Sequence, residues 1–236
     1  MQSRIQKIRE EERKYHETCY NTHQLFEQGS WLHKPVQTVL DALSNFDSSP
    51  CVKVLDLGCG VGRNSIPIAE SLRGREGGVI CVDLLESALT KLTRYSQAYG
   101  VDEYIETKCC DIGDYDIAPG EFDYIVSVSA LEHVESLTKL HLLLERMVQG
   151  TKMDGVNCIV LNSNIRETDL LTGMELDPNI ELNMTTSEAK QLLAAVYTGW
   201  ELVYTTVKSL EFTIERGGRQ ILLGSDAITY VVKRAG

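Results

Sequence analysis

The sequence predicts an α/β fold in which helices cover a mostly parallel β-sheet. Residues 53–65, with the sequence KVLDLGCGVGRNS, combine a strand-like apolar run, a turn with glycine at every second position and a helix start. Further apolar runs of strand length alternate along the chain with segments of helical periodicity. Because several of these runs end at an acid, we expect carboxylates to gather at one edge of the sheet, where open α/β sheets bind ligands.

Composition limits the classes of function. The 236 residues are 43% hydrophobic and 24% charged, which fits one globular domain. A formal net charge of −11 and the absence of a basic stripe argue against a nucleic-acid partner. No apolar run approaches a membrane span and the N-terminus is too polar for a signal peptide, so we expect a soluble, cytoplasmic protein without a membrane partner. Seven cysteines without paired spacing predict reduced thiols and no metal site.

The first 28 residues predict an amphipathic helix, because Ile5, Ile8, Tyr15, Cys19 and Tyr20 fall on one helical face. Two interpretations remain open, a helix that only packs on the domain and a lid over a bound ligand. In the second, Tyr15, Tyr20 and Trp31 form an aromatic wall. After a break at residues 29–30, Pro35 predicts a helix running to about residue 46 and then a loop into the first strand.

The glycine turn decides between nucleotide ligands. A dinucleotide fingerprint requires a third glycine where this chain has Arg63, which disfavours an NAD-dependent dehydrogenase. Asp56, directly before the glycines, suits a ligand with a positive charge, which indicates S-adenosylmethionine (SAM). Asp83 ends the second strand about twenty residues after Gly62, the interval expected for an acid that binds ribose, and Leu84 would flank the adenine.

The third and fourth strands complete the predicted cofactor site. Residues 104–110 read as a strand ending at Asp111, which would hold the adenine amino group while Ile112 packs on the ring. Residues 122–129 form the fourth strand, so Val128 and Ser129 face the cofactor. Residues 130–134 should enter a helix to about residue 147. There Glu132 and His133 suit a general base or acceptor contacts, although a helix-start acid and a satisfied histidine are the commoner case.

The last third of the chain is less regular. A fifth strand is expected within residues 155–162, followed by a long irregular segment, 163–184, which either covers the acceptor site, with Asn162, Asn164 and Arg166 at its root, or is a surface insertion. Thr185 and Glu188 have capping-box spacing and begin a helix. Residues 200–207 and 227–233 read as strands, the last antiparallel, with a hairpin turn at residues 217–218 between them.

The string 54–62 (VLDLGCGVG), followed by Asp83, Asp111 and residues 122–127 (FDYIVS), resembles the class I SAM-dependent methyltransferases over most of the chain. The resemblance implies a Rossmann-like seven-stranded sheet in the order 3-2-1-4-5-7-6 with strand 7 antiparallel. Residues 1–48 would be a helical lid segment and residues 49–236 the SAM-binding methyltransferase domain. It also implies that the turn from Gly58 through Cys59 and Gly60 to Gly62 passes under the methionine part of SAM.

A weaker similarity links the chain to the tellurite-resistance branch of that superfamily. It rests on residues 62–65 (GRNS), 197–201 (YTGWE) and 227–233 (AITYVVK). Members of that branch carry a His-Arg pair between the last two strands, where this chain has Glu211 and Phe212. An acid at that position does not suit an anionic chalcogen acceptor.

The predicted function is transfer of the SAM methyl group, by in-line displacement, to a small-molecule acceptor. His133 is the first candidate for a catalytic residue, and Tyr15, Tyr20, Trp31, His33 and Arg166 are candidate acceptor contacts. A SAM-binding sensor or partner subunit without catalysis and a protein methyltransferase are the alternatives. The sequence leaves the oligomeric state and the identity of the acceptor open.

Overall fold

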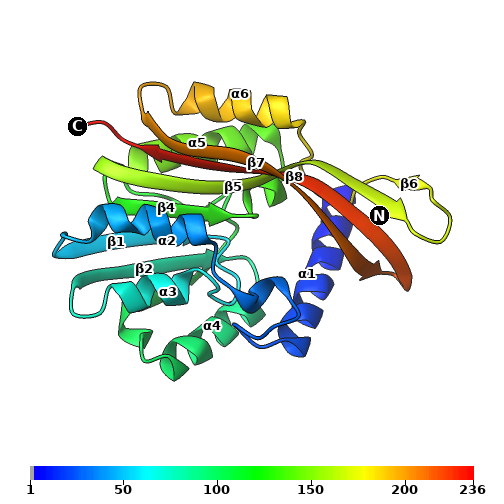
Figure 1. Ribbon diagram of the computed structural model, residues 1–236, viewed down its shortest axis with the longest axis horizontal. Coiled ribbons are helices and arrows are strands. Elements are labelled where there is room, and N and C mark those ends of the chain that lie inside the picture. Colours follow the sequence, from blue (N-terminus) through cyan, green and yellow to red (C-terminus); the bar gives the residue numbers. More distant parts are fainter. Residues whose placement is uncertain (1–2) are drawn as a thin grey trace.

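The computed structural model describes residues 3–236 as one mixed β-sheet between two layers of helices (Figure 1). The strands are β1 Cys51–Leu57, β2 Glu76–Asp83, β3 Ile105–Cys109, β4 Phe122–Val128, β5 Thr151–Asp169, β6 Glu175–Leu176, β7 Glu201–Arg216 and β8 Arg219–Lys233. They lie in the order β3-β2-β1-β4-β5-β8-β7, and β6 pairs with β5 outside this path. β8 is antiparallel to both neighbours, and the others on the path from β3 to β5 pair in parallel. The predicted topology is confirmed, because the two-residue β6 only shifts the strand numbers by one.

Helices cover both faces of the sheet. They are α1 Arg4–Thr22, α2 Gln37–Leu43, α3 Ser65–Ser71, α4 Glu86–Ala98, α5 Leu137–Gly150 and α6 Thr186–Val196, with short 3-10 helices η1 Trp31–His33, η2 Ser44–Phe46, η3 Asp102–Tyr104 and η4 Leu131–His133. Buried residues of α2, α3 and α4, such as Val39, Ile66 and Leu92, pack against one face of the sheet. Leu140 of α5 and Leu193 of α6 pack against the other. The sheet is therefore packed against two separate hydrophobic cores, one on each face.

Local signals place several elements as predicted. α4 covers the expected residues 86–98. α6 begins with the predicted capping box, in which the Thr185 hydroxyl accepts the N–H of Glu188 while the Glu188 carboxylate accepts the N–H of Thr185. β7 and β8 form a hairpin that turns at Gly217 and Gly218, both with positive φ.

Two predicted boundaries are wrong. Residues 130–134 do not enter a helix directly, because η4 ends at His133 and α5 begins only at Leu137, after its N-cap Ser136. The segment 163–184 is not wholly irregular, since β5 continues to Asp169 paired with β8 and β6 follows. In that continuation, buried and more exposed residues mostly alternate, as expected for a strand. Polar residues at buried positions, such as Ser163, obscure this pattern in the sequence.

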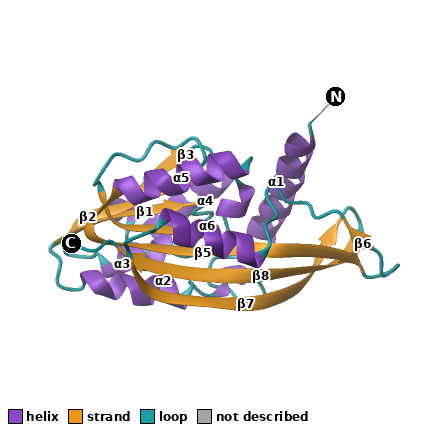
Figure 2. Ribbon diagram, turned by 90° about the horizontal axis from the view of Figure 1, so that it is seen from above, coloured by secondary structure: helices purple, strands orange, loops and turns teal. Residues whose placement is uncertain are grey.

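The long strands β5, β7 and β8 continue past the parallel part of the sheet as an arm that carries β6 (Figure 1). From above, α1 stands beside this arm at the same end of the molecule (Figure 2). α2 lies elsewhere, on the sheet, where the Tyr124 hydroxyl donates to the carbonyl of Val39. The predicted lid segment 1–48 is therefore not uniform. α2 belongs to one of the two helical layers on the sheet, whereas α1 and η1 lie outside these layers.

Candidate functional site

The turn after β1, residues 58–62, has glycine at every second position and therefore exposes much of its backbone. Gly58, Gly60 and Gly62 have φ values of +77°, +54° and +93°, which side chains rarely tolerate. A Cβ on Gly58 would lie 2.2 Å from the Cβ of Ala130, and one on Gly62 would lie 2.4 Å from a methyl carbon of Leu92. The turn is therefore pressed between the segment after β4 and α4, and glycine is required for that approach.

Asp83 at the end of β2 binds this turn. Its Oδ2 accepts the N–H of Gly60 at 2.8 Å, and its Oδ1 accepts the N–H of Leu85 at 2.8 Å. Burial raises the pKa of Asp83, although these N–H groups oppose the shift. Leu84, which follows it, is 47% exposed. The structure therefore brings the predicted ribose acid and the glycine turn together.

Asp56 lies beneath the turn. The residue is 1% exposed, and its Oδ2 accepts the hydroxyl of Ser65, the first residue of α3, at 2.6 Å. Burial raises the pKa of Asp56 to about 6, although the hydrogen bond from Ser65 opposes the shift. Asp56 thus holds the turn onto α3, and the expectation that it points at the ligand does not match this placement.

Aromatic rings from α1 and η1 lie over the turn. The Tyr20 hydroxyl would be 2.9 Å from a Cβ on Gly60. The His16 ring lies 5.4 Å from Tyr15, 5.7 Å from Tyr20 and 6.0 Å from Trp31 between centroids. The three aromatic residues predicted for the acceptor side thus form one cluster, and His16 is at its centre.

Ion pairs fasten α1 across the same edge. Arg9 Nη2 lies 2.7 Å from Oδ2 of Asp111, the predicted adenine acid, and Arg9 Nε lies 3.5 Å from a carboxylate oxygen of Glu181. Arg216 at the end of β7 lies 3.1 Å from the carboxylate of Glu12. The helix therefore spans from the predicted adenine position to the arm.

His133 lies at the end of η4 beneath α1. Its Nδ1 is 3.0 Å from Oε2 of Glu181. Burial alone would lower the pKa of His133, but the hydrogen bond to Glu181 and the charges of Glu132 and Glu12 outweigh it and raise the pKa to about 9. At neutral pH the ring is therefore an imidazolium, which donates hydrogen bonds and has no lone pair for accepting a proton.

Glu132, beside it, is 2% exposed. Its Oε1 accepts the amide N–H of Asn162 at 2.6 Å, and the Asn162 carbonyl oxygen accepts the hydroxyl of Ser225 at 3.2 Å. Its backbone carbonyl accepts the N–H of Leu182 at 3.0 Å. The second carboxylate oxygen, Oε2, is buried without a hydrogen-bond partner among residues 3–236. Burial raises the pKa of this carboxyl group.

The remaining predicted site residues divide into two groups. Cys59, Ile112 and Val128 are buried at the carboxyl ends of their strands, and Ser129 is exposed with φ of +52°. For the two other candidate acceptor contacts, His33 and Arg166, no hydrogen bond or ion pair joins the side chain to the turn within residues 3–236. Arg166 is exposed beside Gly224 of β8.

Sequence reasoning missed Glu12, His16 and Glu181. The first two had a usable signal, because residues 9, 12, 16 and 20 recur at helical spacing on the face of α1 that turns toward the site. Glu181 had none, since it lies in a loop after β6. In the part of the chain that the structure describes, no His, Cys, Asp and Glu side chains form a metal-binding group of three, and no helix has the length and apolar character to cross a membrane.

Comparisons with known proteins agree with this geometry. Residues 54–155 match the family model described as a methyltransferase domain. A carboxy-S-adenosyl-L-methionine synthase of Shewanella baltica is 28% identical over 134 residues, covering 57% of this chain and 53% of the relative. The chain thus spans about half the length of the curated relatives it matches.

Solved structures show the same fold. TehB from Haemophilus influenzae superposes with a TM-score of 0.61 at 21% identity, covering 94% of this chain and 66% of that one. A SAM-dependent methyltransferase from Methanosarcina mazei gives a TM-score of 0.58 at 17% identity, covering 86% of this chain and 99% of that one. The family's cofactor, SAM, fits the glycine cradle and the acid beside it. Residues 54–155 therefore match a methyltransferase domain, and the chain as a whole has the fold of solved SAM-dependent methyltransferases.

Proposed function

We propose that this protein is an enzyme that transfers a methyl group from SAM to a small molecule held between the glycine turn and α1. Bound SAM would supply a methyl group on a positively charged sulfur. The backbone of Gly58, Gly60 and Gly62 would hold its methionine part, and Asp83 would hold its ribose. Leu84 and Ile112 would flank the adenine.

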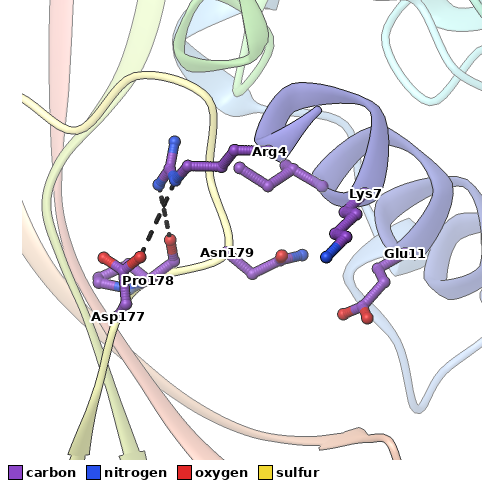
Figure 3. Close-up of a pocket in the computed structure, with 7 residues that line it drawn as sticks. Arg4, Lys7, Glu11, Asp177, Pro178 and Asn179 are labelled. Atoms are coloured by element: carbon purple, nitrogen blue, oxygen red, sulfur yellow. Dashed lines mark hydrogen bonds and ion pairs between the residues drawn. The ribbon is translucent and has the colours of Figure 1, made fainter. Parts of the chain in front are cut away.

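Closure of the site supports a small acceptor. The hydroxyl of Tyr20 lies on the turn, and the ion pairs of Arg9 and Arg216 hold α1 over this edge. Two grooves lie away from the turn, one between α1 and residues 177–179 (Figure 3) and one beside Arg216, and neither is lined by the glycine turn. A folded protein as acceptor would require an open approach to the turn, which α1 covers.

Methyl transfer from a sulfonium requires alignment and exclusion of water more than side-chain chemistry. Tyr20 and Trp31 suit the exclusion of water, because their rings pack over the turn. The imidazolium of His133 is suited to orienting an acceptor by donating a hydrogen bond to a polar group other than the atom that receives the methyl group. In this proposal His133 is a positioning group at neutral pH, and its use as a base is confined to pH values above about 9.

The name of the Shewanella relatives offers a second reaction, synthesis of a carboxylated SAM. That product would bring a carboxylate to a region that already contains Glu12 and Glu132. Arg9 is already paired with Asp111 and Glu181, and Arg216 with Glu12 and Glu167, while the guanidinium of Arg63 donates to the Trp31 carbonyl and lies over the Trp31 ring. Repulsion between carboxylates therefore favours methyl transfer over this alternative.

Labelled SAM separates the remaining possibilities. The protein would be incubated with methyl-labelled SAM and an extract that is afterwards divided into a small-molecule and a protein fraction. We expect label in the small-molecule fraction. Label only in protein would identify a protein methyltransferase, and binding without transfer would identify a sensor or partner subunit.

Binding is measured separately by thermal shift. SAM at a hundredfold excess over its dissociation constant stabilises by about 2.7 kcal/mol, or roughly 5 to 10 °C for a chain of this size. Asp83→Ala should abolish most of this shift and the transfer of label. Asp116→Ala, which removes an exposed acid outside the site, is the matched control and should change neither.

A further inference from the structure

The unpartnered oxygen of Glu132 requires a hydrogen-bond donor. Glu132 is 2% exposed, and its Oε2 has no partner among the described residues. A carboxylate oxygen buried without a donor is strongly unfavourable compared with one in water. Its position therefore suits a group that arrives from outside the chain and donates a proton or a hydrogen bond.

This oxygen is fixed rather than free to turn away. Ser225 donates to the Asn162 carbonyl oxygen, and the Asn162 amide donates to Oε1 of Glu132. The backbone of Glu132 is held as well, because its carbonyl accepts the N–H of Leu182. Two strands and a loop thus orient one carboxylate whose second oxygen is unused.

Glu132 lies close to the cofactor turn. It is two residues after Ala130, whose Cβ fills the space that a side chain on Gly58 would need. His133, the next residue, binds Glu181 beneath α1. The segment from Ala130 to His133 therefore leads from the glycine turn toward α1, the region where the proposed function places the acceptor.

The surrounding charges are predominantly negative. Six carboxylates share this region with four cations, His133, Arg9, Arg63 and Arg216. The acids are Glu12, Glu132, Glu181, Asp83, Asp111 and Glu167.

His16 does not change this balance. Burial and the charge of His133 lower the pKa of His16 to about 4, so at neutral pH its ring is uncharged. The His16 Nδ1 is also buried without a partner. The excess of carboxylates favours a cationic ligand over a neutral or anionic one.

We propose that Glu132 binds the ammonium group of an amine acceptor through Oε2, so that the methyl acceptor is an amine nitrogen. This rests on the proposed function. The group that binds is a primary or secondary ammonium, which carries at least two N–H donors and a positive charge. One N–H meets Glu132, and the rings of Tyr20 and His16 lie on the side of α1.

Glu132 also takes the proton. The proton moves from the ammonium nitrogen to Oε2, the N–H bonding pair stays on nitrogen as a lone pair, and Glu132 becomes a neutral carboxylic acid. The neutral amine that results is the form that can accept a methyl group. Burial, which raises the pKa of Glu132, makes the carboxylate a better proton acceptor than one in water.

The test measures binding and does not depend on turnover. Protein saturated with S-adenosylhomocysteine would be titrated calorimetrically with butylamine, phenethylamine and spermidine, and with butanol and phenethyl alcohol as matched probes without the charge. We expect at least one amine to bind at least tenfold more tightly than its alcohol. Equal affinities for each amine and its alcohol, or no binding of any amine, would overturn the proposal.

Substitutions test whether Glu132 is the residue that binds the amine. Glu132→Gln should weaken amine binding by roughly 10- to 100-fold, the loss expected for a hydrogen bond to a charged group. Glu135→Gln removes an exposed acid three residues later and should leave the affinity unchanged. An unchanged amine affinity in Glu132→Gln would contradict the assignment.

Two measurements distinguish failure of the amine proposal from failure of the proposed methyltransferase function. Binding of S-adenosylhomocysteine, measured first in each variant, reports the fold and the cofactor site. If Glu132→Gln loses that binding, Ser225→Ala replaces it, because it only loosens Asn162 and should weaken amine binding about two- to fivefold. Normal cofactor binding and labelling of a non-amine product would refute the amine while retaining the methyltransferase.

Discussion

The charge on His133 is the property of the site that can be measured most directly. Its Nδ1 lies 3.0 Å from Glu181 Oε2, and the pKa of about 9 exceeds the ordinary value of 6.5. Replacing Glu181 with glutamine keeps the size of the side chain and a hydrogen-bonding oxygen but removes the charge. We expect the pKa of His133 to fall by about one unit or more.

The effect on stability follows from linkage. A difference of 2.5 pKa units sets a ceiling of about 3.4 kcal/mol on the stabilisation of the charged ring. The His133 side chain is 31% exposed, so solvent screening reduces this to about 1 to 2 kcal/mol. Because the folded pKa lies above the unfolded one, this stabilisation is complete below about pH 6.5 and is lost as the pH rises through about 9.

Two assays check the prediction. Nuclear magnetic resonance titration of labelled histidine gives the pKa of His133 in the wild type and in Glu181→Gln. Denaturant unfolding at pH 6, 7.5 and 9.5 gives the free energy of unfolding, and the difference between the two proteins should shrink across this series. His141 and Glu145, 3.4 Å apart and about half exposed, form a matched surface pair, so Glu145→Gln should cost less than about 0.5 kcal/mol. A wild-type His133 that titrates at or below pH 6.5 would refute the reasoning.

Further predictions concern the turn, the lid and a helix start. Gly58→Ala should destabilise the fold by more than about 2 kcal/mol in denaturant unfolding, because its Cβ would overlap that of Ala130 at 2.2 Å. Arg216→Ala breaks the ion pair to Glu12, so limited proteolysis should cut α1 several times faster while the rest of the chain resists. Thr185→Ala removes the capping box of α6 and should lower the thermal midpoint by roughly 2 to 4 °C, corresponding to about 1 kcal/mol.

The features that sequence predicted well depend on short stretches of chain. The glycine turn, the position of Asp83 beside it and α4 are specified by residues close together in sequence, so their spacing is informative. Asp56 was harder to place, because β1 is buried on both faces and alternation cannot tell which side of the turn a side chain will reach.

The position of α1 and the arm formed by β5, β7 and β8 depend on contacts between residues far apart in the sequence. β5 extends to Asp169 only because β8 pairs with it there, and residues 163–169 alone carry too many polar side chains to indicate a strand. Glu181 belongs to the site because it forms a hydrogen bond with His133, which lies 48 residues earlier in the chain. No local pattern encodes such contacts, so the sequence predicted the helix but not the ion pairs that hold it.

The way in which α1 is fastened has a consequence for biosynthesis. The contact between Glu12 and Arg216 joins residues 204 positions apart, and Arg9 and Arg4 bind residues beyond position 110. On the ribosome this helix emerges well before its anchoring partners, of which Arg216 is translated last. α1 therefore docks late during synthesis. Until then, a nascent chain exposes the glycine turn that α1 covers in the complete fold.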